Sequence, residues 1–298
     1  MATFKEQMKW LIVGGSGQLG RAMQTELSNS GINVLSFDRS QLDVTNNEKI
    51  IRIFKDELPD VVLNAAGWTN VDAAESAEED ARLVNAYGPG LLAKACSLID
   101  AKFVHISTDY VFSGISKRPW AEESMPAPVS AYGRTKAEGE KLVQESSLHD
   151  FFIIRTSWLY SPWGKNFVKT MVRLALQEAG SVEVVCDQIG QPTSALDLAA
   201  QIHRMIDHDV APGIYHGTNS GKASWFEFAQ HIFELLGTDL DRIFPVDSAH
   251  YPRPAKRPMY SVLGHQRWID EGLTPMRDWR EALENVLPTI IQAMSLGE

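Results

Sequence analysis

Cysteine is rare in this sequence, and its rarity excludes two kinds of site. Of the 298 residues, 2 are cysteine, Cys96 and Cys186. They are too few and too far apart in the sequence to form a disulfide framework or a CxxC metal site. We therefore expect a protein of a reducing compartment, the cytoplasm.

Histidine pairs with metal-binding spacing are also missing. The chain has 8 histidines, but none stands in the HxxxH or HExxH pattern that zinc sites on helices use. The nearest cluster, His203 and His208, is more typical of a solvated helix end, and His105 lies inside an apolar run, as a core histidine would. We predict no metal site.

Long apolar runs and a surplus of positive charge are missing as well. No segment approaches the roughly 20 apolar residues of a membrane span, and residues 1–10 lack the continuous apolar stretch of a signal peptide. With 28 basic against 38 acidic residues the formal net charge is -10, which disfavours attraction to nucleic acid or anionic lipid. We expect a cytosolic protein with no nucleic-acid or membrane partner, which holds any phosphate-bearing ligand by local groups.

The composition that remains is typical of a folded enzyme. Hydrophobic residues make up 44% of the chain and charged residues 22%, close to the averages for soluble globular proteins. A chain of 298 residues is long enough for about two domains of roughly 100 to 200 residues each.

Short apolar runs alternate with helical patterns through the first half of the chain. The length and flanks of these runs favour buried parallel strands. The predicted strands are residues 9–13, 33–37, 60–64, 102–107, 151–156 and 182–186, and the predicted helices between them are residues 21–29, 47–57, 77–99 and 130–145. The alternation implies right-handed crossovers, so we predict an α/β fold with a Rossmann-like, doubly wound parallel sheet.

The regular alternation fades after Thr156. Helical patterns at 166–177 and 223–236 are joined there by proline-rich connections. We predict a dinucleotide-binding domain over residues 1–156 and a smaller, mixed α/β substrate domain over residues 157–298. The helix at 196–206 could still pack back on the sheet, so part of residues 182–210 is expected to belong to the first domain.

A glycine-rich turn directly follows the first predicted strand and opens the first helix. Its glycines are spaced GxxGxxG, and small residues let the backbone approach a pyrophosphate that meets the unpaired N–H groups of the helix. A plain strand-to-helix turn also favours glycine, but the strand and helix context favours a cofactor. The predicted contacts in this turn are Gly14, Ser16, Gly17, Gln18 and Leu19.

The second predicted strand ends at an acidic and a basic residue, Asp38 and Arg39. An acid at this distance from the glycine turn favours NAD, because it can bind the adenosine ribose. The neighbouring guanidinium can bind a 2'-phosphate, so the pair permits NADH and mildly favours NADPH. Two solvated loop charges are the simpler interpretation. Further on, Asp43 and Val44 could border the adenine, although Asp43 is as typical of a helix or turn cap.

Small residues end the third predicted strand, at Ala65, Ala66 and Gly67. A flat cofactor lying against the carboxyl edge of a parallel sheet needs such residues, and ligands bind at this edge in doubly wound folds. Tight packing of the strand against its loop would also explain them. We predict a cofactor contact.

A tyrosine and a lysine stand four residues apart on a predicted helix, Tyr132 and Lys136. Their spacing places both side chains on one helix face. A lysine cation beside a phenol lowers the pKa of the phenol, which makes the tyrosine a usable proton donor near neutral pH. Such a pair also arises by chance on an exposed helix face.

Two hydroxyls, Ser107 and Thr108, end the fourth predicted strand upstream of this pair. A hydroxyl there can donate a hydrogen bond to a carbonyl oxygen that the tyrosine protonates. Together with the glycine turn, these elements in this order are hard to obtain by accident.

With these motifs the sequence resembles the extended short-chain dehydrogenase/reductase family, and within it the reductases of dTDP-linked 4-ketosugars. The resemblance covers most of the chain. The segments that carry it are residues 17–20, 64–67, 71–72, 74–75, 107–112, 132–136, 155–158, 166–167, 187–193, 257–258 and 261.

The resemblance implies a role for each matching residue. Tyr132 would donate the proton, Lys136 would hold the nicotinamide ribose, and Thr108 would orient the substrate carbonyl. Asp109 and Trp158 would line the sugar site. Asn166 and Arg257 would face the nucleotide diphosphate. Taken alone, Trp158 is as typical of core packing, Asn166 of a helix cap and Arg257 of a surface ion pair.

The resemblance therefore implies reduction of the C4 ketone of a dTDP-linked 6-deoxyhexulose by NADPH or NADH, in a homodimer. Two alternatives stay open. A reductase or epimerase of another nucleotide sugar would use the same residues, and a non-catalytic regulatory subunit could keep the dinucleotide fold.

Overall fold

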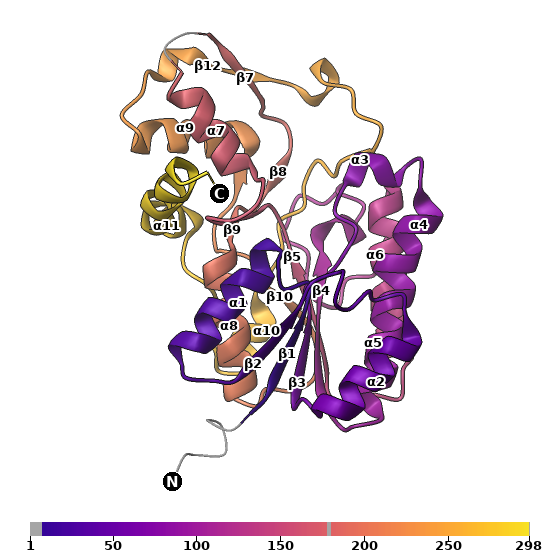
Figure 1. The fold of residues 1–298 in the computed structure, drawn as a ribbon. Helices are drawn as coiled ribbons and strands as arrows, with labels where there is room; N and C mark the ends of the chain where they lie inside the picture. Colours follow the sequence, from indigo (N-terminus) through magenta and orange to yellow (C-terminus); the bar gives the residue numbers. More distant parts are fainter. Residues whose placement is uncertain (1–7, 178–179, 298) are drawn as a thin grey trace.

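A parallel β-sheet with helices on both faces forms the larger part of the computed structural model (Figure 1). The structure describes residues 8–177 and 180–297. Most of residues 1–10, for which the sequence predicts no signal peptide, lies outside these ranges. The six strands of the sheet run in the order β10-β5-β4-β3-β1-β2. They are β1 (Trp10–Val13), β2 (Val34–Phe37), β3 (Val61–Asn64), β4 (Lys102–Thr108), β5 (Phe151–Thr156) and β10 (Gly213–His216).

The central strands are buried on both faces, as their unbroken apolar sequences predict. In β1, the side chains of Trp10 and Ile12 join the core on one face and those of Leu11 and Val13 the core on the other. This alternation follows from the two-residue period of a strand. The predicted α/β fold with a doubly wound parallel sheet is confirmed.

Helices cover the two faces of this sheet as separate layers (Figure 1). On one face α1 (Gln18–Asn29) packs against α8 (Ala195–Asp207), with α10 (Gln266–Asp270) beside them. The other face is covered by α2 (Asn47–Glu57), α5 (Gly88–Ser97) and α6 (Ala131–Gln144). The helix expected at 196–206 thus returns to the sheet, beside α1.

The sixth strand of the main sheet is not the one that the sequence predicts. Residues 182–185 form β7 (Val182–Val185), but β7 pairs with β12 (Ile243–Val246) in a separate two-stranded sheet. The strand beside β5 is β10, for which the sequence gives no strand prediction. β10 is only four residues long and contains a glycine and a histidine, so it lacks the apolar run that marks the other strands.

The predicted helix at 77–99 is divided into three parts. α4 (Glu78–Arg82) is followed by a π-helical turn, η2 (Leu83–Tyr87), and then by α5. The N–H of Gly88 bonds to the carbonyl of Leu83, five residues back. Pro89 has no N–H to offer the carbonyl of Asn85, four residues back, which explains why a regular helix does not continue here.

A second core lies in the C-terminal part of the chain. It is built from α7 (Phe167–Ala175), α9 (Trp225–Leu235) and α11 (Trp279–Ser295), packed with β7 and β12. Short pairs join this lobe to the rest: β6 (Leu159–Tyr160) with β9 (Thr193–Ser194), and β8 (Ile189–Gly190) with β11 (Ala223–Ser224). Within residues 8–177 and 180–297, no helix combines the length and apolar character needed to cross a bilayer.

Candidate active site

A cavity of about 680 Å³ opens at the carboxyl ends of the sheet strands. Its walls come from the turn after β1, the loops after β2 and β3, the end of β4, and α6. The structure brings most of the predicted site residues together here. Those that line the cavity are Gly14, Ser16, Gly17, Gln18, Leu19, Arg39, Asp43, Val44, Ala65, Ala66, Gly67, Thr108, Asp109, Tyr132, Lys136 and Trp158.

The glycine turn is shaped by close backbone contacts. Gly14 has a φ of +84°, and a Cβ there would lie 2.6 Å from the backbone nitrogen of Ala66. Only glycine fits both conditions. α1 begins at Gln18 with Gly17 as its N-cap and no capping side chain, so its first N–H groups have no partner within the helix. They face the cavity and are suited to a phosphate.

The acidic and basic residues after β2 take different orientations. Asp38 turns its carboxylate to its own loop, accepting hydrogen bonds from the backbone and hydroxyl of Ser40 at 2.8 and 2.6 Å, and it does not line the cavity. Arg39 does line the cavity, with its side chain 85% exposed and 3.6 Å from Asp43. Asp43 also accepts hydrogen bonds from the backbone N–H and the hydroxyl of Thr45. It therefore caps a turn, which is one of the two roles expected from the sequence.

The catalytic residues expected from the sequence lie close together in the structure. Tyr132 is at the start of α6, and a hydrogen bond with Thr108 lowers its pKa against the stronger effect of burial. Thr108 ends β4, and its hydroxyl donates to Asp109 at 3.0 Å. Lys136 lies one turn further along α6 and donates from Nζ to the carbonyl of Ile106 at 2.5 Å.

Burial controls the protonation of these groups. It raises the pKa of Tyr132 to about 12, which differs from the lowered value expected from the neighbouring lysine. It lowers the pKa of Lys136 to about 8, against an opposing effect of the Glu140 carboxylate. It raises the pKa of Asp109 to about 6. At neutral pH the tyrosine therefore carries its proton and the lysine is largely charged, which suits proton donation by Tyr132.

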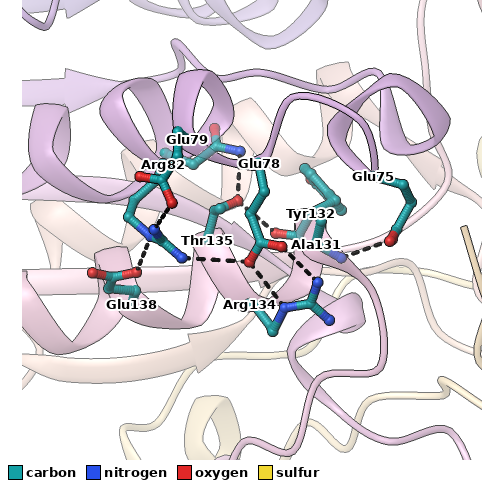
Figure 2. Close-up of polar contacts among 10 residues, drawn as sticks. Glu75, Glu78, Glu79, Arg82, Ala131, Tyr132, Arg134, Thr135 and Glu138 are labelled. Atoms are coloured by element: carbon teal, nitrogen blue, oxygen red, sulfur yellow. Dashed lines mark hydrogen bonds and ion pairs between the residues drawn. The ribbon is translucent and has the colours of Figure 1, made fainter.

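An ion-pair network holds α6 against α4 (Figure 2). Arg134 donates to both carboxylate oxygens of Glu78, at 2.9 and 2.7 Å, and Arg82 donates to Glu138 at 2.9 Å. Glu75 accepts the backbone N–H of Ala131 at 2.8 Å, at the first residue of α6. Glu75 and Glu78 thus hold the start of α6 in place, and Glu78 is also the first residue of α4.

The buried Asn85 joins the two sides of this part of the site. From the π-helical turn its amide exchanges hydrogen bonds with the backbone of Trp68, at 2.8 and 3.1 Å, and donates to Thr135 at 3.2 Å. Thr135 in turn donates to the carbonyl of Tyr132 at 2.9 Å. The loop after β3 and the catalytic helix are therefore tied together.

Trp158 has an uncommon backbone conformation at the cavity wall. Its φ of +45° is rare for a bulky residue, and its ring stacks on Trp225 with 3.6 Å between centroids. Gly190 lies beneath it, since a Cβ there would be 2.7 Å from the Trp158 ring. The strained loop presents an aromatic surface to the cavity.

Of the residues to which the resemblance assigns a catalytic or substrate-binding role, Asn166 and Arg257 do not line the cavity. Asn166 caps α7 and donates to Gln18 at 3.1 Å, next to the glycine turn. Arg257 forms a two-pronged ion pair with Asp72, at 3.0 and 2.9 Å. Asn166 is therefore a helix cap and Arg257 is part of an ion pair, the structural roles that their residue types allow. Both residues also join the C-terminal lobe to the sheet side.

Several lining residues were not predicted. They came from loops with no recognisable local pattern, or they neighbour predicted residues in sequence. They are Leu42, Trp68, Thr69, Val71, Val84, Ile106, Tyr110, Thr156, Ser157, Leu159 and Gly164. Ser107, one of the two hydroxyls that the sequence indicates, lines the cavity as well. Within the described ranges, no group of three or more His, Cys, Asp or Glu side chains is placed to hold a metal ion.

The parallel sheet, the glycine turn and the Tyr132–Lys136 pair define a class, the short-chain dehydrogenase/reductase enzymes. The chain belongs to one family within it, described as the RmlD substrate binding domain, whose model matches residues 8–291.

Named relatives cover nearly the whole chain. A probable dTDP-4,6-dihydroxy-2-methyloxan-3-one 4-ketoreductase of Streptomyces antibioticus is 43% identical over 96% of this chain and 97% of its own length. A dTDP-4-dehydrorhamnose reductase of Mycolicibacterium smegmatis is 43% identical over 96% and 87%. The crystal structure of dTDP-4-dehydrorhamnose reductase from Bacillus anthracis in complex with NADP is 38% identical, covers 95% of this chain and 99% of that one, and has a TM-score of 0.91.

Proposed function

We propose that this protein is a dTDP-4-dehydrorhamnose reductase, which reduces the C4 ketone of dTDP-4-dehydro-L-rhamnose to give dTDP-L-rhamnose with NADPH. One observation carries the proposal: Tyr132, Lys136 and Thr108 meet at one wall of the cavity whose other wall is the glycine turn. The name of the relative from Mycolicibacterium smegmatis, at 43% identity over almost the full chain, supports the same reaction.

The residues present fit a dinucleotide. The close approach at Gly14 and the free N–H groups of α1 suit the pyrophosphate. Arg39 is the residue that favours NADPH, because its guanidinium lines the cavity while the Asp38 carboxylate is turned to Ser40. The relative from Bacillus anthracis, which binds NADP, supports this choice. NADH would lack the phosphate that Arg39 binds.

The chain's own residues account for the proton and for the position of the ketone. NADPH supplies a hydride when it is bound. Thr108 turns its hydroxyl from Asp109 to donate a hydrogen bond to the ketone oxygen. Tyr132 transfers its phenolic proton to the same oxygen as negative charge develops there. The charged Lys136 stabilises the phenolate that forms when Tyr132 gives up its proton. Lys136 also holds the nicotinamide ribose.

The sheet side and the C-terminal lobe contact different ligands. We propose that the sheet side binds the dinucleotide, and that the lobe built on α7, α9 and α11 covers the sugar nucleotide. Asp109 and Trp158, which line the cavity, contact the sugar. Arg257 reaches the diphosphate by leaving Asp72, and Asn166 supports the site through Gln18. A cytoplasmic location fits this chemistry, and the homodimer stays a prediction.

A second candidate is reduction of another dTDP-linked 4-ketosugar. The relative from Streptomyces antibioticus favours it, because its name gives a different 4-ketone at the same identity of 43%. The residues around the ketone are the same for both candidates. An epimerase would use them too, but it would regenerate its cofactor.

The test is to incubate the purified protein with dTDP-4-dehydro-L-rhamnose and each reduced cofactor in turn. We expect stoichiometric loss of NADPH absorbance at 340 nm and dTDP-L-rhamnose as the product identified by mass and NMR. Product without net loss of the cofactor would indicate an epimerase instead. Oxidation of neither cofactor would contradict the proposal.

A further inference from the structure

A buried ion pair joins the catalytic helix α6 to strand β5 behind the cavity wall. Arg155 donates from Nε and Nη2 to the two carboxylate oxygens of Glu140, at 3.0 and 2.8 Å. The side chains are 1% and 2% exposed. Ser107 donates its hydroxyl to the same carboxylate at 2.5 Å. A carboxylate in this position therefore accepts three hydrogen bonds from neighbouring elements.

Arg155 is held in place from two further directions. Its Nη1 donates to the carbonyl of Glu122 at 3.0 Å, and its guanidinium lies 4.9 Å above the ring of Phe112. Buried ion pairs of this kind contribute little net stability compared with apolar residues of similar size. The pair therefore calls for an explanation other than stability.

The pair touches the catalytic machinery without lining the cavity itself. Glu140 follows Lys136 by four residues on α6, so the two side chains share a helix face. Ser107 precedes the catalytic Thr108 on β4, and its proton is committed to Glu140. The Thr108 hydroxyl donates to Asp109 at 3.0 Å in this structure and would turn from that carboxylate to donate to a ketone.

We propose that Glu140 is a positioning residue, which keeps Lys136 charged and Ser107 turned away from the substrate, with Arg155 as the cation that holds Glu140 in place. The inference rests on the proposed function, because it concerns the lysine of that reaction. It adds Glu140 to the residues proposed above for the reaction, which are Tyr132, Lys136 and Thr108.

The charges around Lys136 determine the direction in which Glu140 changes the pKa of Lys136. Of the ionisable groups on the surrounding elements, Glu140 on α6 and His105 on β4 interact electrostatically with Lys136. Tyr132 lies on the same helix, Asp109 follows β4, and Arg155 on β5 is paired with Glu140. Burial and the nearby Lys136 push the pKa of His105 well below its usual value, so it is neutral. Glu140 is then the nearby anion on the helix of Lys136, and it opposes the loss of the lysine's proton on burial.

Removing Glu140 should therefore lower the pKa of Lys136. Removing Arg155 should lower it as well, because a buried carboxylate without its cation is neither held in place nor kept charged. The test compares wild type with Glu140→Gln, Arg155→Met and the double variant, after thermal unfolding has shown that each is folded. Two quantities are measured from pH 6 to pH 10: the Kd of NADPH, by fluorescence titration, and kcat/KM for the sugar nucleotide. The binding curve requires no turnover.

We expect the alkaline midpoint of both curves to fall by about one pH unit or more in Glu140→Gln, to fall in Arg155→Met as well, and to fall no further in the double variant than in Glu140→Gln. Should Glu140→Gln not fold because it leaves Arg155 unpaired, a fall of the midpoint in Arg155→Met supports the proposal and an unchanged midpoint contradicts it. A loss of NADPH affinity or of kcat/KM that is equal at every pH, with unchanged midpoints, overturns the proposal and leaves Glu140 a purely structural role. If wild type binds NADPH but turns over no sugar, the proposed function fails, and the binding curves still decide this inference.

Discussion

At the scale of single residues, small differences in orientation decide which cofactor fits. Asp38 and Arg39 are neighbours in the sequence, yet the carboxylate turns into its own loop while the guanidinium lines the cavity. The sequence alone permits NADH as well as NADPH, because it does not show which of two adjacent side chains points inward. In the structure three hydrogen bonds from the next turn hold the carboxylate of Asp38 away.

Arg39→Ala is therefore expected to weaken NADPH binding by about tenfold, the loss of one charge-assisted hydrogen bond of about 1.5 kcal/mol. NADH binding should change little, because NADH carries no 2'-phosphate. Fluorescence titration with both cofactors measures the two Kd values. The matched control is Arg52→Ala, which removes an exposed arginine of α2 that does not line the cavity. Equal losses for NADPH and NADH would contradict the role of Arg39.

At the scale of elements, the start of α6 is fixed by more than its own cap. Ser130 caps the helix by accepting the N–H of Gly133 at 3.1 Å, as its sequence position allows. The carboxylate of Glu75, 56 residues earlier, accepts the N–H of Ala131. Local patterns predicted α6 to within one residue at each end, but they could not predict the partner of its first N–H, because that partner comes from another element.

Glu75→Ala should lower the free energy of unfolding by about 0.5 to 1 kcal/mol, the usual cost of a lost capping interaction. We expect kcat to fall by more, about tenfold, because Tyr132 follows the unsupported residue directly and misplacement of a catalytic group is costly. Denaturant unfolding and initial-rate kinetics measure the two effects. Glu79→Ala is the control, since the side chain of Glu79 is 82% exposed and forms its ion pair with Arg82 of the same helix α4 and not with α6. Unfolding energies and kcat that change alike in the two variants would argue against this role of Glu75.

At the scale of the whole molecule, the sequence predicts the sheet better than it predicts how the two lobes meet. Five strands of the sheet could be predicted because both of their faces are buried, which leaves a continuous apolar run. β10 was missed because it is short and partly polar, and β7 was placed in the wrong sheet because an apolar run does not reveal its neighbour.

The candidate site follows the same rule. Its contiguous motifs, the glycine turn and the Tyr132–Lys136 pair, could be read directly, since each is one turn of backbone. Contacts between distant segments could not. The Arg257–Asp72 pair joins residues 185 positions apart, and the Glu140–Arg155 pair depends on the register of α6 over the sheet.

The measurement that tests the central claim most directly is single-turnover reduction by Tyr132→Phe. This variant keeps the ring and removes the phenolic proton that the account assigns to the ketone oxygen. We expect NADPH to bind with an unchanged Kd and the rate of NADPH oxidation with dTDP-4-dehydro-L-rhamnose to fall by about 100-fold or more, the usual contribution of general acid catalysis. Turnover at the wild-type rate by a variant that binds NADPH normally would contradict the account.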